Sequence, residues 1–217
     1  MKILLALVTA FGLSSSALAQ AGVQPIEVTP FAGYLFGGKL LSSPPIPFVG
    51  FDQIAVADHF DFGVRLGFNA SSTIEPEIQW TRTNTALMLE PVPGQPNLLK
   101  PSLTIDYLLA GASYNFLSGN IRPYVSLSLG AARISEVGQL NLVGYQLMPA
   151  TNFAVSAGVG VKMFMTPNLG FRFEARGYGS ETPGNFVAAC SMGDVSRSCV
   201  KSWIMNGDLT GGLVIAF

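Results

Sequence analysis

The chain has 217 residues, of which 49% are hydrophobic and only 12% are charged, and its formal net charge is −1. A soluble domain of this size carries about twice that share of charged residues, so the composition disfavours a soluble domain. A near-neutral chain also has no electrostatic footprint for nucleic acid, which excludes that class of partner.

The first 19 residues have the pattern of a secretory signal peptide. Lys2 gives a positive start, residues 3–13 are apolar, and Ala17 and Ala19 form a small-x-small cleavage box. We expect cleavage after Ala19, which leaves a mature domain of residues 20–217. The apolar run of about 11 residues is too short for a membrane-spanning helix, which needs about 20. No later run is long enough either.

The mature chain predicts strands, because apolar and polar residues alternate with a period of two. In residues 60–69, five large apolar side chains share one face, and Asp61, Arg65 and Asn69 share the other. Alternation over about ten residues is typical of strands that face lipid on one side and a polar lumen on the other. The predicted strands are residues 26–38, 57–69, 74–85, 102–116, 121–134, 151–165, 168–180 and 203–217.

The segments between these strands alternate strictly between short and long. The short ones, near residues 69–73, 117–120 and 166–168, are rich in Asn, Ser and Gly and suit tight hairpins. The long ones are residues 39–56, 86–101, 135–150 and 181–202. Periplasmic turns and extracellular loops alternate in this way in outer-membrane barrels. We therefore expect an all-β fold, an eight-stranded antiparallel up-and-down transmembrane β-barrel.

Charged residues of both signs fall on the polar faces of the predicted strands. We expect them to fill the lumen, since an eight-stranded barrel has room inside for little more than side chains. A turn centred on Ser71 would place Arg65 opposite Glu77. The predicted lumen network comprises Arg65, Glu75, Glu77, Lys162, Arg172, Glu174, Arg176 and Asp208.

Aromatic residues near the predicted strand ends are expected to face the membrane interfaces. They are Tyr34, Phe36, Trp80, Tyr107, Tyr114, Phe116 and Trp203. Strand 102–116 is ambiguous, because Asp106 shares a parity with Tyr114 and Phe116. Either a bulge interrupts this strand, or Asp106 lies above the hydrocarbon near the loop end.

The last segment, residues 210–217, resembles the C-terminal assembly signal of outer-membrane proteins, carried by Thr210, Gly212, Ile215 and Phe217. Residues 28–38 and 122–130 are similar to strands of the small outer-membrane β-barrel domain family, which includes OmpA-type and opacity-protein-like barrels. The resemblance implies export through the periplasm to the bacterial outer membrane, insertion by the barrel-assembly machinery, and contact with outer-membrane lipid. It leaves function open, because one fold hosts many functions.

Residues that suggest catalysis are few. His59 with a loop serine such as Ser42 or Ser43 could form a base–nucleophile pair, but nothing in the spacing specifies a triad. Asp58, His59 and Asp61 give only a weak metal pattern. We therefore expect no enzyme activity, no cofactor and no metal ligand set.

Two cysteines, Cys190 and Cys199, lie in the last long loop. The periplasm is oxidising, so we expect a disulfide between them. A loop whose shape is held in this way suggests a recognition surface for an extracellular ligand. The expected function is therefore structural, or recognition and adhesion through the loops. The alternatives are a small conduit for small or apolar solutes and an enzyme that modifies lipid A.

Overall fold

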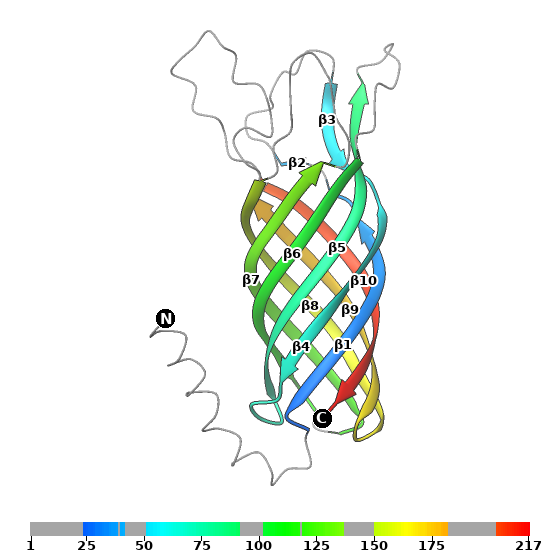
Figure 1. Cartoon of the computed structure of the whole chain (residues 1–217), viewed down its shortest axis with the longest axis vertical. Helices are drawn as coiled ribbons and strands as arrows, with labels where there is room; N and C mark the ends of the chain where they lie inside the picture. Colours follow the sequence, from blue (N-terminus) through cyan, green and yellow to red (C-terminus); the bar gives the residue numbers. More distant parts are fainter. Residues whose placement is uncertain are drawn as a thin grey trace, which may run out of the picture.

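The computed structural model describes eight long strands that close into a barrel (Figure 1). The described residues are 24–38, 40–41, 51–91, 102–117, 119–136, 150–181 and 203–217. The wall strands are β1 (Ile26–Phe36), β4 (His59–Phe68), β5 (Ile74–Pro91), β6 (Ser102–Asn115), β7 (Ile121–Glu136), β8 (Ala150–Thr166), β9 (Leu169–Glu181) and β10 (Trp203–Ala216). The predicted fold class is confirmed. Among the described residues, no helix is long and apolar enough to cross a membrane.

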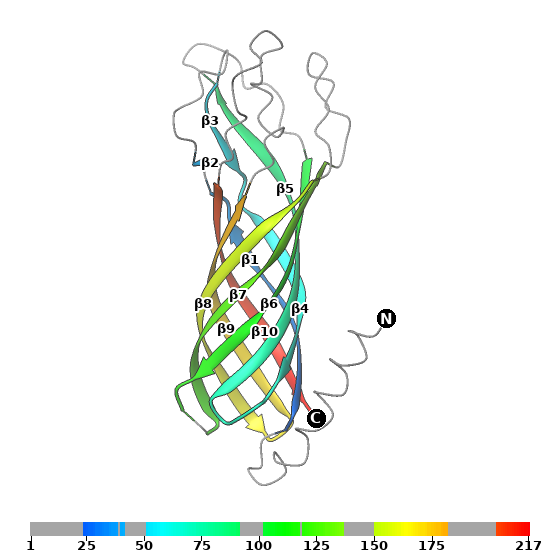
Figure 2. The ribbon, with the colours of Figure 1, turned by 90° about the vertical axis from the view of Figure 1, so that its left-hand side faces the viewer.

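Each wall strand pairs antiparallel with its neighbour along the chain, and β1 pairs with β10 to close the ring. At this seam, the Phe217 N–H donates to the Ile26 carbonyl at 2.9 Å, and the Ile26 N–H donates to the Phe217 carbonyl at 3.3 Å. The strands tilt around the barrel axis, and the short turns lie at the end that holds the C-terminus (Figure 2). Closure leaves no unpaired strand edge in the wall, which is a condition for crossing a bilayer.

The rim opposite the short turns, which the loop pattern predicts to be extracellular, differs from the prediction of only a loop at residues 39–56. Two further strands lie in this segment, β2 (Leu40–Leu41) beside β10 and β3 (Phe51–Val56) beside β5. Pairing with β3 extends β5 to Pro91, beyond the predicted end at residue 85, and the two strands rise above the barrel (Figure 1). Alternation marks strands buried on one side and gives no signal for a pairing outside the wall.

The outer wall is apolar. Leu127, Leu129 and Val159 are each more than half exposed and point away from the lumen. Aromatic contacts occur toward both ends: Tyr34 packs edge-on against Phe36 and Phe60, and Tyr114 packs edge-on against Phe116. Contiguous apolar surface of this extent is stable in lipid and not in water.

Strand β6 resolves one ambiguity of the sequence and corrects one prediction. It runs without a bulge, and Asp106 faces outward, where Arg82 binds it through two hydrogen bonds of 2.7 and 3.0 Å. Tyr107, expected in the outer aromatic belt, instead lies fully buried inside the barrel. Leu103, Ile105 and Leu109 share its face. Near the rim this strand is therefore apolar toward the lumen and carries Thr104 and Asp106 at the outward positions, which reverses the pattern that the prediction assumed.

Candidate functional site

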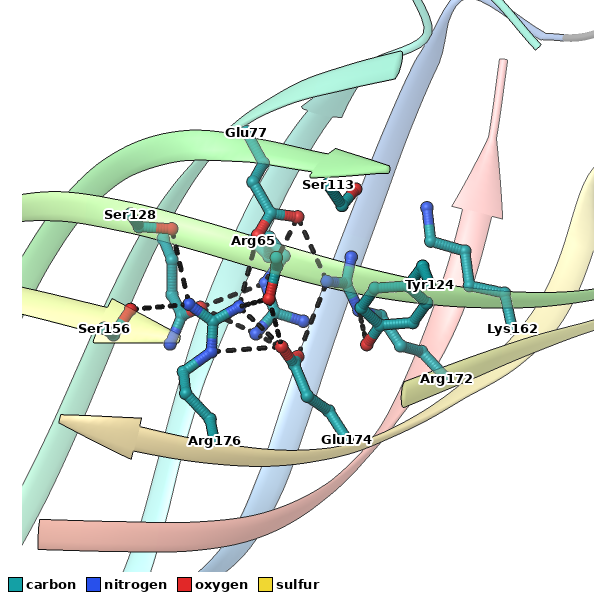
Figure 3. Close-up of polar contacts among 12 residues, drawn as sticks. Arg65, Glu77, Ser113, Tyr124, Ser128, Ser156, Lys162, Arg172, Glu174 and Arg176 are labelled. Carbon is teal, nitrogen blue, oxygen red and sulfur yellow. Dashed lines mark hydrogen bonds and ion pairs between the residues drawn. The ribbon is translucent and has the colours of Figure 1, made fainter. Parts of the chain in front are cut away.

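The lumen of the barrel is filled by side chains in successive layers. The central layer is an ion-pair cluster of three arginines and two glutamates (Figure 3). The Glu174 carboxylate forms ion pairs with Arg176 at 2.6 Å and with Arg65 at 2.7 Å. The Glu77 carboxylate forms ion pairs with Arg172 at 3.1 Å and with Arg176 at 3.2 Å. All five side chains are at most 2% exposed. The layer therefore consists of desolvated charges that depend on one another.

The register in this layer differs from the prediction. Arg65 lies opposite Gln79 rather than Glu77, and the Arg65 guanidinium donates to Gln79 Oε1 at 2.6 and 3.1 Å. Glu77 lies opposite Gly67 and reaches Arg65 only diagonally, at 3.8 Å. The β4–β5 turn is therefore centred one residue later than expected. Within the turn, the Ser71 hydroxyl accepts the Ile74 N–H.

A second cluster lies near the periplasmic end. The Lys162 ammonium binds both Glu27, at 2.6 Å, and Glu75. The Asn69 amide donates to the other oxygen of Glu27 at 2.9 Å. Sequence reasoning named Lys162 and Glu75 but missed Glu27, although its parity with Thr29 on β1 marks it as inward-facing.

Above the central cluster, the lumen holds a layer of uncharged polar groups and carboxylates. The Tyr178 hydroxyl donates to Asp208 at 2.7 Å and accepts from Gln79 at 3.0 Å. The Tyr107 ring stacks on Tyr178 with centroids 4.5 Å apart, and its hydroxyl accepts from Asn206 at 3.0 Å. Asp208 therefore lies inside the lumen, opposite Arg176 in the register of β9 and β10, but forms no ion pair with the arginine cluster.

The extracellular end of the lumen is apolar. Besides Tyr107 and Tyr178, a buried cluster at this end comprises Leu35, Val56, Leu103, Ile105, Leu109, Ala132, Ile134, Ala154 and Ile204. Val56 comes from β3, so the segment that rises above the rim also contributes to this layer. The layer separates the buried charges from the extracellular side.

Glycines in β8 make room for these side chains. A Cβ at Gly158 would overlap Glu174 Oε1 and lie 2.8 Å from the Ser126 hydroxyl, and one at Gly160 would overlap the Tyr124 hydroxyl. Tyr124 in turn accepts from Arg172 at 2.6 Å. The sequence analysis missed Tyr124 and Ser126, because neutral residues do not stand out among alternating positions.

The residues considered for catalysis do not come together in the described part of the chain. His59 is exposed at the start of β4, with Nδ1 3.3 Å from the Phe60 carbonyl oxygen, whereas Asp61 is buried in the lumen. Asp58 accepts the Gly37 N–H at 2.8 Å. Ser42, Ser43, Cys190 and Cys199 lie outside the described residues, so the disulfide stays a prediction.

The four residues of the predicted assembly signal lie at the seam. Thr210 and Gly212 pair with Gly33 and Phe31 of β1, and Ile215 pairs with Val28. Phe217 is 60% exposed on the outer surface and holds the last backbone hydrogen bonds of the ring.

No protein-family model and no curated protein matches the sequence, whereas solved structures match the fold. Neisserial surface protein A is 17% identical, with 88% of this chain and 97% of that chain covered and a TM-score of 0.54. OprG from Pseudomonas aeruginosa is 10% identical, with 90% and 98% covered and a TM-score of 0.57. AlkL, solved in lipid bilayers, is 14% identical, with 90% and 91% covered and a TM-score of 0.52.

These similarities establish the fold of the small outer-membrane β-barrels. With the apolar outer wall, they support localisation to the bacterial outer membrane. Neighbours of the same fold carry different names and sequences that are at most 17% identical to this chain, so the particular function must be argued from this chain's own residues.

Proposed function

We propose that this protein is a sealed outer-membrane barrel that presents its long extracellular loops for recognition or adhesion, and that it is neither a general porin nor an enzyme. The observation that carries the proposal is the filled lumen. Two ion-pair clusters and an apolar layer occupy its length, and their side chains are almost completely buried. An ion that crossed the barrel would have to displace charges held by several partners each, which is costly in a desolvated interior.

The loop sequences suggest an apolar partner surface. Residues 86–101 carry only Glu90 and Lys100 as charged side chains, and residues 135–150 carry only Glu136. The same segments are rich in Leu, Val, Met and Pro. Loops on a rigid scaffold are where binding residues concentrate, and apolar exposed segments mark interaction sites.

Conductance tests the sealed lumen. The barrel, inserted into a planar bilayer, should show no stable conductance steps at moderate voltage. A barrel of similar size with a known open channel, measured in the same bilayer, is the control. Regular steps that scale with salt concentration would contradict a sealed lumen.

Recognition is tested separately on cells. Cells that express the full chain are compared, on an array of glycans and matrix proteins, with cells that express a barrel whose segments 92–100 and 138–149 are replaced by short Gly-Ser turns. Binding by the full chain and none by the trimmed barrel is the expected result, provided that both reach the surface equally. Equal signals from both would contradict a role of these loops.

A second candidate is a conduit for apolar solutes. It is favoured by the apolar layer at the extracellular end of the lumen, which an apolar molecule would meet first. Uptake of a radiolabelled alkane into vesicles that contain the barrel discriminates the conduit from the sealed scaffold. A sealed scaffold should give the uptake rate of vesicles without protein, and a conduit should give a faster rate.

A further inference from the structure

Two buried carboxylates in the upper lumen form no ion pair in the described part of the chain, although Arg176 lies opposite one of them, Asp208, in the register of β9 and β10. They belong to Asp61 on β4 and Asp208 on β10, which are 2% and 3% exposed. Among the described residues, four cationic and six acidic side chains are buried. The three arginines are paired with Glu77 and Glu174, and Lys162 is paired with Glu27 and Glu75. The lumen thus carries an excess of two negative charges, and Asp61 and Asp208 are the acids without an ion pair.

In the wall, strand β1 lies between β4 and β10, which carry these two side chains. Asp61 lies opposite Gly33, and Asp208 lies opposite Leu35 two residues further along β1. Gly33 has no side chain to separate them, and a Cβ there would lie 2.9 Å from Asp61 Oδ1. Both side chains are buried in the lumen, two positions apart in the register along β1.

A third oxygen group joins them from the neighbouring strand. Thr83 on β5 lies directly opposite Asp61 and is fully buried. Its hydroxyl, both carboxylate oxygens of Asp61 and Oδ1 of Asp208 have no hydrogen-bond partner in the described part of the chain. The other oxygen of Asp208 accepts the Tyr178 hydroxyl at 2.7 Å. Buried polar atoms are almost always satisfied, so four unsatisfied oxygens on β4, β5 and β10 point to a missing partner.

The nature of that partner follows from charge and from atom type. Water could donate hydrogen bonds to the oxygens but would leave two buried negative charges uncompensated, which costs several kcal/mol for each ion. A proton shared by the carboxylates would satisfy two of the four oxygens but would still leave one buried negative charge. A hard divalent cation would balance both charges, and carboxylates, hydroxyls and water are the ligands that Ca²⁺ takes in its sphere of six to eight oxygens.

We propose that Asp61, Asp208 and Thr83 form a binding site for one hard divalent cation of the calcium type inside the lumen. No group of three or more His, Cys, Asp or Glu side chains gathers in the described part of the chain, so hydroxyl and water oxygens complete the coordination. The site ties β4, β5 and β10 together on either side of β1. It does not depend on the proposed recognition role of the loops.

Because the site is buried beneath the apolar layer, the cation is supplied during refolding. The mature chain is refolded into detergent micelles with CaCl₂, MgCl₂ or a chelator and then desalted, and metal per barrel is measured by plasma mass spectrometry. The variant is Asp61→Asn/Asp208→Asn, which keeps the shape and removes both charges. The matched control is Asp58→Asn/Asp106→Asn, which makes the same changes outside the lumen. The difference in electrophoretic mobility with and without heating verifies that each barrel has folded.

The wild type and the control should retain about one Ca²⁺ per barrel, and the lumen variant at least about tenfold less. The melting temperature of the wild type should rise with the calcium concentration used in refolding, as for any ligand that binds only the folded state. The lumen variant should not respond. Calcium absent from the folded wild type, or retained equally by the lumen variant, would overturn the proposal. A wild type that is stabilised by acidification and indifferent to calcium would overturn it in favour of a shared proton.

Discussion

At the scale of single residues, the central cluster is asymmetric, with three guanidinium groups around two carboxylates. Glu174 contacts Arg65, Arg172 and Arg176 and also accepts from Ser126 at 3.0 Å. Loss of this carboxylate would leave three buried cations with Glu77 alone, whereas loss of Arg65 would leave two cations with two acids. The effect of removing each residue on stability therefore depends on the net charge that remains buried in the cluster.

We expect Glu174→Gln to lower the free energy of unfolding by about 3–5 kcal/mol, the usual cost of a broken buried pair. Adding Arg65→Gln should recover part of the loss, because it removes one of the uncompensated cations. Urea unfolding of the barrel in lipid vesicles measures both. The control is Asp106→Asn, which breaks the partly exposed pair with Arg82 on the outer wall and should have little effect. A double variant less stable than Glu174→Gln would contradict the coupling.

A second prediction concerns the space left by a glycine. In Gly158→Ala, the new methyl group would lie closer than van der Waals contact to Glu174 Oε1 and to the Ser126 hydroxyl, 2.8 Å from the latter. We expect a loss of about 1–3 kcal/mol, the range found for overpacked interiors. Gly119→Ala is the matched control, since a Cβ there meets nothing within 4 Å. Equal stability of the two variants in the same unfolding assay would show that the lumen is not tightly filled at β8.

At the scale of elements, the seam between β1 and β10 is, among the described wall strands, the only pairing between strands far apart in the sequence. Phe217 and Ile26 exchange two backbone hydrogen bonds at its periplasmic end. Removing Phe217 deletes the proposed recognition residue of the assembly signal together with these hydrogen bonds.

Deletion of Phe217 should therefore sharply reduce the folded barrel in the outer membrane while secretion into the periplasm continues. Fractionation of cells followed by electrophoresis without heating measures the folded yield. Phe217→Trp, which keeps an exposed aromatic ring and all backbone groups, should assemble normally. A normal folded yield from the truncated chain would contradict a role in assembly.

Strand positions were predictable because the wall separates lipid from lumen, and alternation records that separation directly. The register between neighbouring strands was not predictable, since a shift of one residue in the turn after Asn69 changes every pair of facing residues. Contacts between side chains across the lumen were also not predictable from the sequence. Arg172 and Glu77 come from β9 and β5, and their meeting depends on the stagger of the strands, which alternation does not specify. The apolar rim layer was missed for a related reason, because Tyr107 and Leu109 have the composition of a lipid-facing strand.

At the scale of the whole molecule, the described wall strands leave no open edge, and the lumen is filled by side chains, most of whose charges are paired. Both features make unfolding cooperative, because opening any hairpin exposes backbone groups and buried charges together. We expect the mature chain to remain folded in sodium dodecyl sulfate at room temperature and to unfold only on heating. Electrophoresis should show a compact band without heating and a slower one after heating. The same mobility in both lanes would contradict this cooperativity.

The exchange of hydrogen bonds between Ile26 and Phe217 also means that the barrel is geometrically a ring without a privileged first strand. A circular permutant, with residues near 24 and 217 joined by a short linker and new ends in segment 138–149, keeps every wall pairing. It should refold in detergent to the same barrel. In cells it should fail to insert, because its assembly signal would no longer be a chain end. The permutant therefore separates the requirements for strand pairing from the requirements for recognition of the chain by the cell.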